Sequence, residues 1–290
     1  MVVLLVAMTA LCGYAQDSYR EAVKEYLVAS GQTRQVARTL TQISQLLFKA
    51  TDDVNLEELV GRYVDENLDK LAEITEKNTK ARDITEGDLR EVSALFSTPE
   101  GQTYIAHQAE WMTEMPKVYV EQMMGDNFLE RLRSFEKSGT VENVPVNPEI
   151  DEEYIAKYMQ TVDDEIFNES LNQYMSRIEE KDVNNVTSRA YWNWVKENMV
   201  TVMLNSSYGI ITKDDLDYII KLKSYESYRK TRKYMNINDD TSKELVVQMM
   251  SEYEEWMKAH GAQLNDQETI GKMVIEKLRE MTGFKFFGSD

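Results

Sequence analysis

Apolar residues recur at spacings of three and four over most of the chain, which is the period of one face of an α-helix. From Val36, the next apolar positions on such a face are Leu40, Ile43 and Leu47. The same spacing continues in later segments, around residues 56–71, 105–123, 191–202, 245–256 and 270–281. No segment alternates with period two for long enough to predict a strand, and only 12 glycines and 4 prolines occur among 290 residues. We therefore predict an all-α fold.

Residues that start and stop helices occur at the ends of these segments. Gly31 and Gly261 stand where a helix needs a left-handed residue after its C-terminus. Asn55 has the side chain of a helix N-cap and is followed three residues later by a glutamate. Thr98 places an N-cap hydroxyl before Pro99, whose missing N–H costs nothing at the first helical position. A long helix is therefore predicted to begin at residue 99.

One short motif occurs twice. Ile-Thr-x-x-Asp-Leu occupies residues 84–89 and 211–216, an offset of 211 − 84 = 127. An upstream match, Val23 with Ile155, has an offset of 155 − 23 = 132. The two offsets differ by 132 − 127 = 5 residues, which one loop or one helical turn would absorb. In both copies the threonine and aspartate have the spacing of a capping box, which fixes where a helix starts. We interpret the two halves as an internal duplication, the alternative being chance similarity between amphipathic helices.

The clearest interruption of the helical pattern is a stretch that contains a glycine and two prolines in an otherwise proline-poor chain. We interpret this stretch, residues 138–150, as an interdomain linker. It would join a first helical domain over residues 16–137 to a second over residues 151–290. The sequence thus predicts two tandem helical bundle domains related by internal duplication.

Residues Ile84–Tyr119 form a longer pattern: a Thr-x-x-Asp-Leu helix, then Phe96-Ser97-Thr98-Pro99-Glu100-Gly101-Gln102, then a long helix containing Pro116. This pattern resembles the domain of unknown function 2059, a family of all-helical bacterial proteins whose typical members are exported. The second copy, around Ile211–Tyr234, lacks the proline and the glycine of the first. The resemblance implies a helical fold and export, and it carries no established activity.

The first residues have the pattern of a signal peptide. Val2–Cys12 is an uncharged apolar run, and Gly13-Tyr14-Ala15 supplies the small residues that signal peptidase requires. We predict that residues 1–15 are removed; a buried N-terminal helix and a lipoprotein anchored at Cys12 are the alternatives. The run is shorter than the roughly 20 residues that span a membrane, so no membrane span is expected. Cys12 is the only cysteine, so the mature chain is expected to have neither disulfides nor thiolate metal sites.

Charge and motifs exclude several classes of function. The chain has 33 basic and 51 acidic side chains and a formal net charge of −18. Nucleic acid is not an expected partner, because proteins bind its phosphates mainly through Lys and Arg. His107 and His260 are the only histidines, neither belongs to a His-Glu-x-x-His zinc motif, and no glycine-rich phosphate loop occurs. We predict no catalytic residue, no cofactor and no metal.

Two groups of residues are candidates for contacts with a partner. The first is a basic cluster, interpreted as a contact for an anionic group or, alternatively, as cations paired with carboxylates of the neighbouring repeat; it comprises Lys221, Lys223, Arg229, Lys230, Arg232 and Lys233. The second is a set of adaptable side chains that would line a groove for a peptide or another helix. Ordinary core packing is the simpler interpretation of these residues, which are Met112, Met115, Tyr119 and Met123.

From these observations we expect an exported protein, periplasmic or secreted, that acts as a non-enzymatic binding or scaffolding module of the bacterial cell envelope. Its expected partner is an envelope protein or peptide. Two alternatives remain open at this point. One is a hydrolase of envelope glycans that uses two carboxylates, and the other is a periplasmic chaperone or assembly factor.

Overall fold

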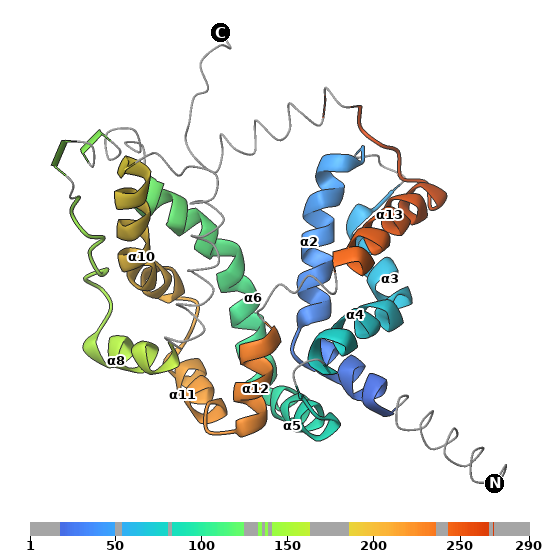
Figure 1. Cartoon of the computed structure of the whole chain (residues 1–290), viewed down its shortest axis with the longest axis horizontal. Helices are drawn as coiled ribbons and strands as arrows, with labels where there is room; N and C mark the ends of the chain where they lie inside the picture. The colour runs from blue at the N-terminus through green and yellow to red at the C-terminus, as the bar shows by residue number, and fades with distance from the viewer. Residues whose placement is uncertain are drawn as a thin grey trace. The chain divides into compact units, whose positions relative to one another are not determined.

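The computed structural model describes residues 18–49, 54–80, 83–124, 133–134, 137–138, 141–162, 186–235, 243–266 and 269. Within these ranges the chain forms helices joined by turns and short irregular segments, and no strand occurs (Figure 1). The predicted all-α fold is confirmed. An isolated antiparallel bridge joins Phe48 and Leu264. The predicted signal peptide, residues 1–15, lies outside the described residues.

The chain folds as two compact units, each assembled from two separate stretches of sequence. The first unit comprises Met1–Ile105 and Leu222–Gly271, and the second comprises Ala106–Lys221 and Lys272–Asp290. This division differs from the predicted one, in which two domains follow one another along the chain. The predicted linker, residues 138–150, falls within the second unit. Packing partners determine the units, and the spacing of apolar residues does not specify which helix packs against which.

The first unit is built from helices of both ends of the chain. The helix over residues 18–29 precedes α2, and α12 packs against α4 and α5 although it is far from them in sequence. The first turns of α6 (Pro99–Tyr119) also belong to this unit. The other helices are α2 (Gln32–Leu47), α3 (Leu56–Glu66), α4 (Leu68–Lys80), α5 (Glu86–Phe96), α12 (Glu226–Met235) and α13 (Lys243–Ala259).

An apolar cluster of the first unit lies among α2, α3 and α13. Tyr63 and Tyr253 meet edge to face with ring centroids 4.7 Å apart, an arrangement that aromatic pairs prefer. Val60 and Met257 are fully buried in the same cluster. The Tyr253 hydroxyl is hydrogen-bonded to Ser44 of α2. These contacts attach α13 to helices near the N-terminus.

Helix ends in the described residues follow the predicted signals. Gly31 and Gly261 have φ angles of 74° and 93°, in the left-handed region that glycine tolerates. The Asn55 side chain accepts hydrogen bonds from two backbone N–H groups in the first turn of α3. The Thr98 hydroxyl accepts the N–H of Gly101 at 3.1 Å at the start of α6. The predicted helix start at residue 99 is confirmed.

The second unit contains the rest of α6 and four further described elements. Pro116 lies inside α6, and one turn of wider π-helix follows shortly after it. Because proline has no N–H, it cannot donate to the carbonyl one turn earlier, and such interruptions accompany irregular helical turns. The four elements are η1 (Val120–Met124), α8 (Glu152–Thr161), α10 (Val186–Ser207) and α11 (Lys213–Leu222).

Candidate functional site

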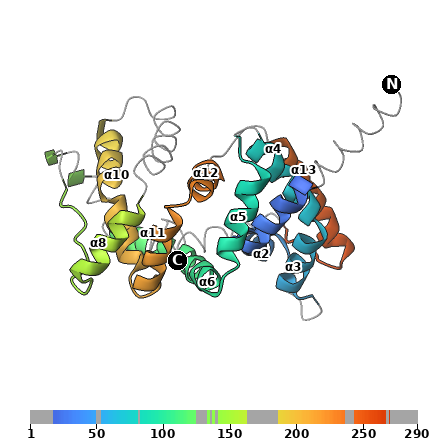
Figure 2. The ribbon, with the colours of Figure 1, turned by 90° about the horizontal axis from the view of Figure 1, so that it is seen from below.

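An irregular segment, residues 141–147, lies along α10 in the second unit (Figures 1 and 2). We call it the extended segment. Trp194, Asn198 and Asn205 of α10 are hydrogen-bonded to it. They are four and seven residues apart, so they share one face of the helix. This face of α10 is the candidate functional site.

The first part of the extended segment is held by two α10 side chains. The indole N–H of Trp194 donates to the carbonyl oxygen of Glu142 at 3.1 Å. The Asn198 Oδ1 atom accepts the backbone N–H of Val144 at 2.6 Å, and its Nδ2 atom donates to Asn143 Oδ1 at 3.1 Å. Asn198 is only 2% exposed. A buried amide needs partners for its donors and acceptor; the extended segment supplies two of them, and the carbonyl oxygen of Trp194, 2.8 Å from Asn198 Nδ2, supplies the third.

The second part of the extended segment is held by one asparagine, through both ends of its amide. Asn205 Nδ2 donates to the carbonyl oxygen of Pro145 at 3.0 Å, and Asn205 Oδ1 accepts the backbone N–H of Asn147 at 2.9 Å. Asn205 Nδ2 also donates to Oε1 of Gln122 at 3.0 Å. This asparagine therefore joins the segment to both α10 and η1.

Apolar contacts also bind the extended segment. Val141 and Val144 pack against a buried cluster that includes Met123, Trp194 and Val202. Val202 and Met123 have no exposed surface. The segment is therefore attached in two ways, through its backbone to polar side chains and through two valines to an apolar cluster.

The predicted groove residues have different environments. Met112 is 43% exposed, whereas Met123 is fully buried. Met115 and Tyr119 are half-buried, and Tyr119 packs against the same cluster as the two valines. Met123 is thus a core residue, as the simpler interpretation held, and the chain's own segment covers the cluster to which it belongs.

Part of the predicted basic cluster is engaged in ion pairs. Lys230 Nζ lies 3.3 Å from a carboxylate oxygen of Glu226, one turn earlier on α12, and 3.9 Å from Asp88 of α5. The second contact fits the alternative interpretation, in which the cations pair with carboxylates of the other repeat. Such partly exposed pairs contribute little to stability individually.

The remaining members of the basic cluster do not form one described site. Arg229 donates to the backbone carbonyl of Lys223 at 3.1 Å, and the Arg232 guanidinium lies 6.0 Å from the centre of the Tyr228 ring. Lys221 belongs to the second unit and the others to the first. The side chain of Lys233 lies outside the described part of the chain.

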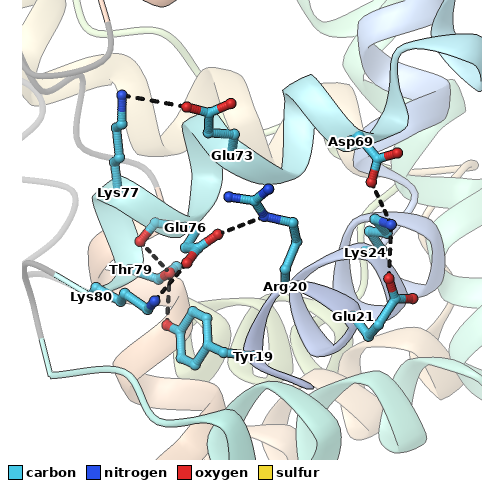
Figure 3. A network of polar contacts seen from close by, with 10 residues as sticks. All are labelled: Tyr19, Arg20, Glu21, Lys24, Asp69, Glu73, Glu76, Lys77, Thr79 and Lys80. Atoms are coloured by element: carbon cyan, nitrogen blue, oxygen red, sulfur yellow. Dashed lines mark hydrogen bonds and ion pairs between the residues drawn. The ribbon is translucent and has the colours of Figure 1, made fainter. Parts of the chain in front are cut away.

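A polar network connects the helix over residues 18–29 to α4 in the first unit (Figure 3). Glu76 is its buried centre and accepts hydrogen bonds from Arg20 at 2.9 Å and Lys80 at 2.5 Å. Burial by itself raises the pKa of Glu76, but the hydrogen bonds from Lys80 and Arg20 outweigh it and hold the pKa below its usual value. We interpret the network as a structural contact between the two helices, because each of these charges is paired with an opposite charge.

The network extends to both sides of Glu76. Lys24 lies 2.8 Å from Glu21 and 2.5 Å from Asp69, and the hydrogen bond from Lys24 lowers the pKa of Asp69. The Tyr19 hydroxyl is 2.8 Å from Thr79 Oγ1 and donates to the carbonyl of Ile84 at 2.9 Å. Burial raises the pKa of Tyr19.

His107 and His260 each contact a neighbouring side chain. His107 Nδ1 lies 2.7 Å from Asp215 Oδ2, and this carboxylate also accepts the N–H and hydroxyl of Thr212. Asp215 therefore serves in the capping box at the N-terminus of α11. His260 stacks on Trp256, with ring centroids 3.8 Å apart.

The described ranges contain no group of three or more His, Cys, Asp or Glu side chains arranged to hold a metal ion. No helix in the described part of the chain is long and apolar enough to cross a bilayer. Comparisons with protein-family models, with curated proteins and with solved structures return no match.

Sequence reasoning missed the three α10 residues that hold the extended segment. A signal was present: Asn198 and Asn205 lie in a helix whose apolar stripe includes Val195 and Val202. Asparagine is a poor helix former, and its buried amide requires partners. Asparagines beside an apolar stripe therefore indicate a polar partner laid across that face.

Proposed function

We propose that this protein is a non-enzymatic binding module that holds extended polypeptide segments along α10. The observation that carries the proposal is the capture of the extended segment by Trp194, Asn198 and Asn205. These side chains contact mainly its backbone N–H and C=O groups. Backbone groups are present in every peptide, so a site of this kind accepts a segment in trans as well as in cis.

The burial of the site supports binding rather than catalysis. The hydrogen bonds of Asn198 are formed in a water-poor setting, where leaving a donor or acceptor unpaired costs about 1–3 kcal/mol. The site therefore requires an occupant that offers a backbone N–H to Asn198 and carbonyl oxygens to Trp194 and Asn205. The carboxylate hydrolase has no comparable support, because the acids that are buried in the described part of the chain, Glu76 and Asp215, are paired with neighbouring side chains.

We further propose that the module is exported and works in the bacterial cell envelope, with an envelope protein or peptide as partner. The apolar run at residues 2–12 and the resemblance of residues 84–119 to the domain of unknown function 2059 support this placement. An export chaperone is the alternative function that the same peptide site would serve.

Internal duplication remains part of the proposal, and matched contacts support it. The hydroxyl of Tyr19 donates to the carbonyl of Ile84, and that of Tyr154 donates to the carbonyl of Ile211, each just before the capping threonine. The two isoleucines have the 127-residue offset of the repeated motif, whereas the two tyrosines are 154 − 19 = 135 residues apart, about one helical turn away from the upstream offset of 132. A tyrosine hydroxyl therefore fixes the start of the same helix in both halves.

A second matched contact has reversed charges. Arg90 pairs with Glu25 at 2.9 Å, and Asp217 pairs with Lys157 at 2.7 Å. Arg90 and Asp217 are 127 residues apart, and Glu25 and Lys157 are 132 apart, which are the two offsets of the repeat. Two halves that diverged from one ancestor would preserve such a pair while exchanging its signs.

The proposed function is tested by a peptide added in trans. The full chain carrying Val141→Ser and Val144→Ser keeps the α10 side chains but weakens attachment of its own segment. A fluorescent peptide with the sequence of residues 139–150 should bind this variant at least tenfold more tightly than the unaltered chain. The reason is that a tethered segment competes at an effective concentration of about millimolar.

The control is a matched asparagine on the same helix. Asn198→Ala, added to the double variant, should abolish peptide binding, whereas Asn193→Ala should leave it unchanged because Asn193 is exposed. Circular dichroism shows whether each variant is folded. Should the double variant unfold, the anisotropy of the fluorescent peptide with the unaltered chain at about millimolar protein provides the readout. Absence of binding in both formats would refute the proposed function.

A further inference from the structure

The exposure of the extended segment repeats every third residue. Val141, Val144 and Asn147 are half-buried, whereas the two residues between each pair are exposed. A β-strand would alternate with period two and turn residues 143 and 145 inward, but both are exposed. Three residues per turn is the period of a left-handed polyproline II helix.

The hydrogen bonds of the segment fit the same conformation. Polyproline II has no internal hydrogen bonds, so its N–H and C=O groups are available to a partner. The α10 side chains use the N–H groups of Val144 and Asn147 and the carbonyl groups of Glu142 and Pro145. Pro145, which has no N–H, contributes only a carbonyl.

The spacing along α10 matches the rise of such a segment. Asn198 and Asn205 are seven residues apart, about 10.5 Å at a rise of about 1.5 Å per residue. The N–H groups they bind belong to residues three apart, about 9.3 Å at about 3.1 Å per residue. Residue numbers increase in the same direction along α10 and along the segment, so the segment runs parallel to the helix.

Resting on the proposed function, we infer that α10 selects proline-containing peptides in the polyproline II conformation. The ligand carries apolar side chains three residues apart, the second followed by proline, as in Val141-x-x-Val144-Pro145. The valines enter the apolar cluster beside Trp194, and the proline restricts the free peptide to a conformation close to the bound one. The chain's own segment is a ligand of this class and occupies the site in cis.

Three peptides test the inference on the full chain carrying Val141→Ser and Val144→Ser. The first has the sequence of residues 139–150. The second has alanine in place of both prolines. The third has the same composition but valines two residues apart, which suits a strand.

We expect the first peptide to bind most tightly. The alanine peptide should bind about fivefold more weakly, because its free form has more conformations to lose, and the third should bind at least tenfold more weakly. On the protein side, Trp194→Phe should weaken the first peptide about fivefold by removing one donor, and Trp256→Phe, in the first unit, should have no effect.

The outcomes separate this inference from the proposed function. Binding of the first peptide with the expected order of affinities supports both. Equal binding of all three peptides overturns the inference but leaves a general peptide site. Failure of every peptide to bind, in anisotropy measurements on the variant and on the unaltered chain, overturns both.

Discussion

Gly101 lies in the first turn of α6, next to the end of α5. A Cβ atom built on it would lie 2.6 Å from the carbonyl oxygen of Phe96 and 2.7 Å from that of Leu95. These are backbone atoms, so the crowding can be relieved only by moving one helix away from the other. Such movement would also strain the hydrogen bond from Gln102 Nε2 to the Phe96 carbonyl, which is 2.9 Å long.

Two effects of Gly101→Ala oppose each other. Overpacking that shifts the backbone costs about 1–3 kcal/mol, and alanine in place of glycine in a helix gains up to about 1 kcal/mol. We expect a net loss of about 1–2 kcal/mol in the free energy of unfolding. Gly61 of α3 is the matched control, because a Cβ there would meet nothing within 4 Å. Gly61→Ala should therefore stabilise the protein by about 0.5–1 kcal/mol.

Urea unfolding followed by far-UV circular dichroism measures both changes. Because the chain has two compact units, the comparison uses transition midpoints from one probe rather than a single two-state free energy. The midpoint should fall for Gly101→Ala and rise for Gly61→Ala. A rise of similar size for both variants would refute the close approach of α6 to α5 at Gly101.

Two further predictions concern buried polar groups. Glu76→Gln should lower stability by about 1–2 kcal/mol near neutral pH by weakening charge-assisted hydrogen bonds. Because the folded-state pKa of Glu76 lies below its usual 4.5, its contribution is complete above that pH and is lost as the pH falls further. Thermal unfolding of the two proteins should therefore converge in acid, and a constant difference would contradict the network. Tyr19→Phe and Tyr154→Phe should each lower the free energy of unfolding by about 1–2 kcal/mol. Because the two tyrosines lie in different units, their effects should add to within about 0.5 kcal/mol in the double variant. Strong non-additivity in urea unfolding would contradict independent sites.

Helices and their ends could be predicted because their causes are local. The Asn55 cap and the Thr85–Asp88 capping box depend on side chains within one turn of the groups they bind. The left-handed φ of Gly31 likewise follows from its own lack of a Cβ atom. Information of this kind is contained in a few consecutive residues.

The candidate site could not be predicted in the same way. Pro145 and Pro148 were interpreted as interruptions, which is correct for helices, but prolines also favour the conformation in which a segment is bound. The partner of the segment, Asn198, is more than 50 residues away in sequence. The spacing of three residues between the two valines can be read from the sequence. Its significance depends on the face of α10, which only folding brings next to the segment.

The two capping aspartates each contact a side chain from the other half of the sequence. Asp88 starts α5 and lies 3.9 Å from Lys230 of α12, and Asp215 starts α11 and lies 2.7 Å from His107 of α6. Each aspartate thus meets a basic side chain from the opposite half of the sequence. Cutting the chain within residues 138–150 would remove α12 from the helices it packs against and α6 from Asp215. The extended segment is therefore bound by a unit that needs both halves, and its binding must be measured on the whole chain.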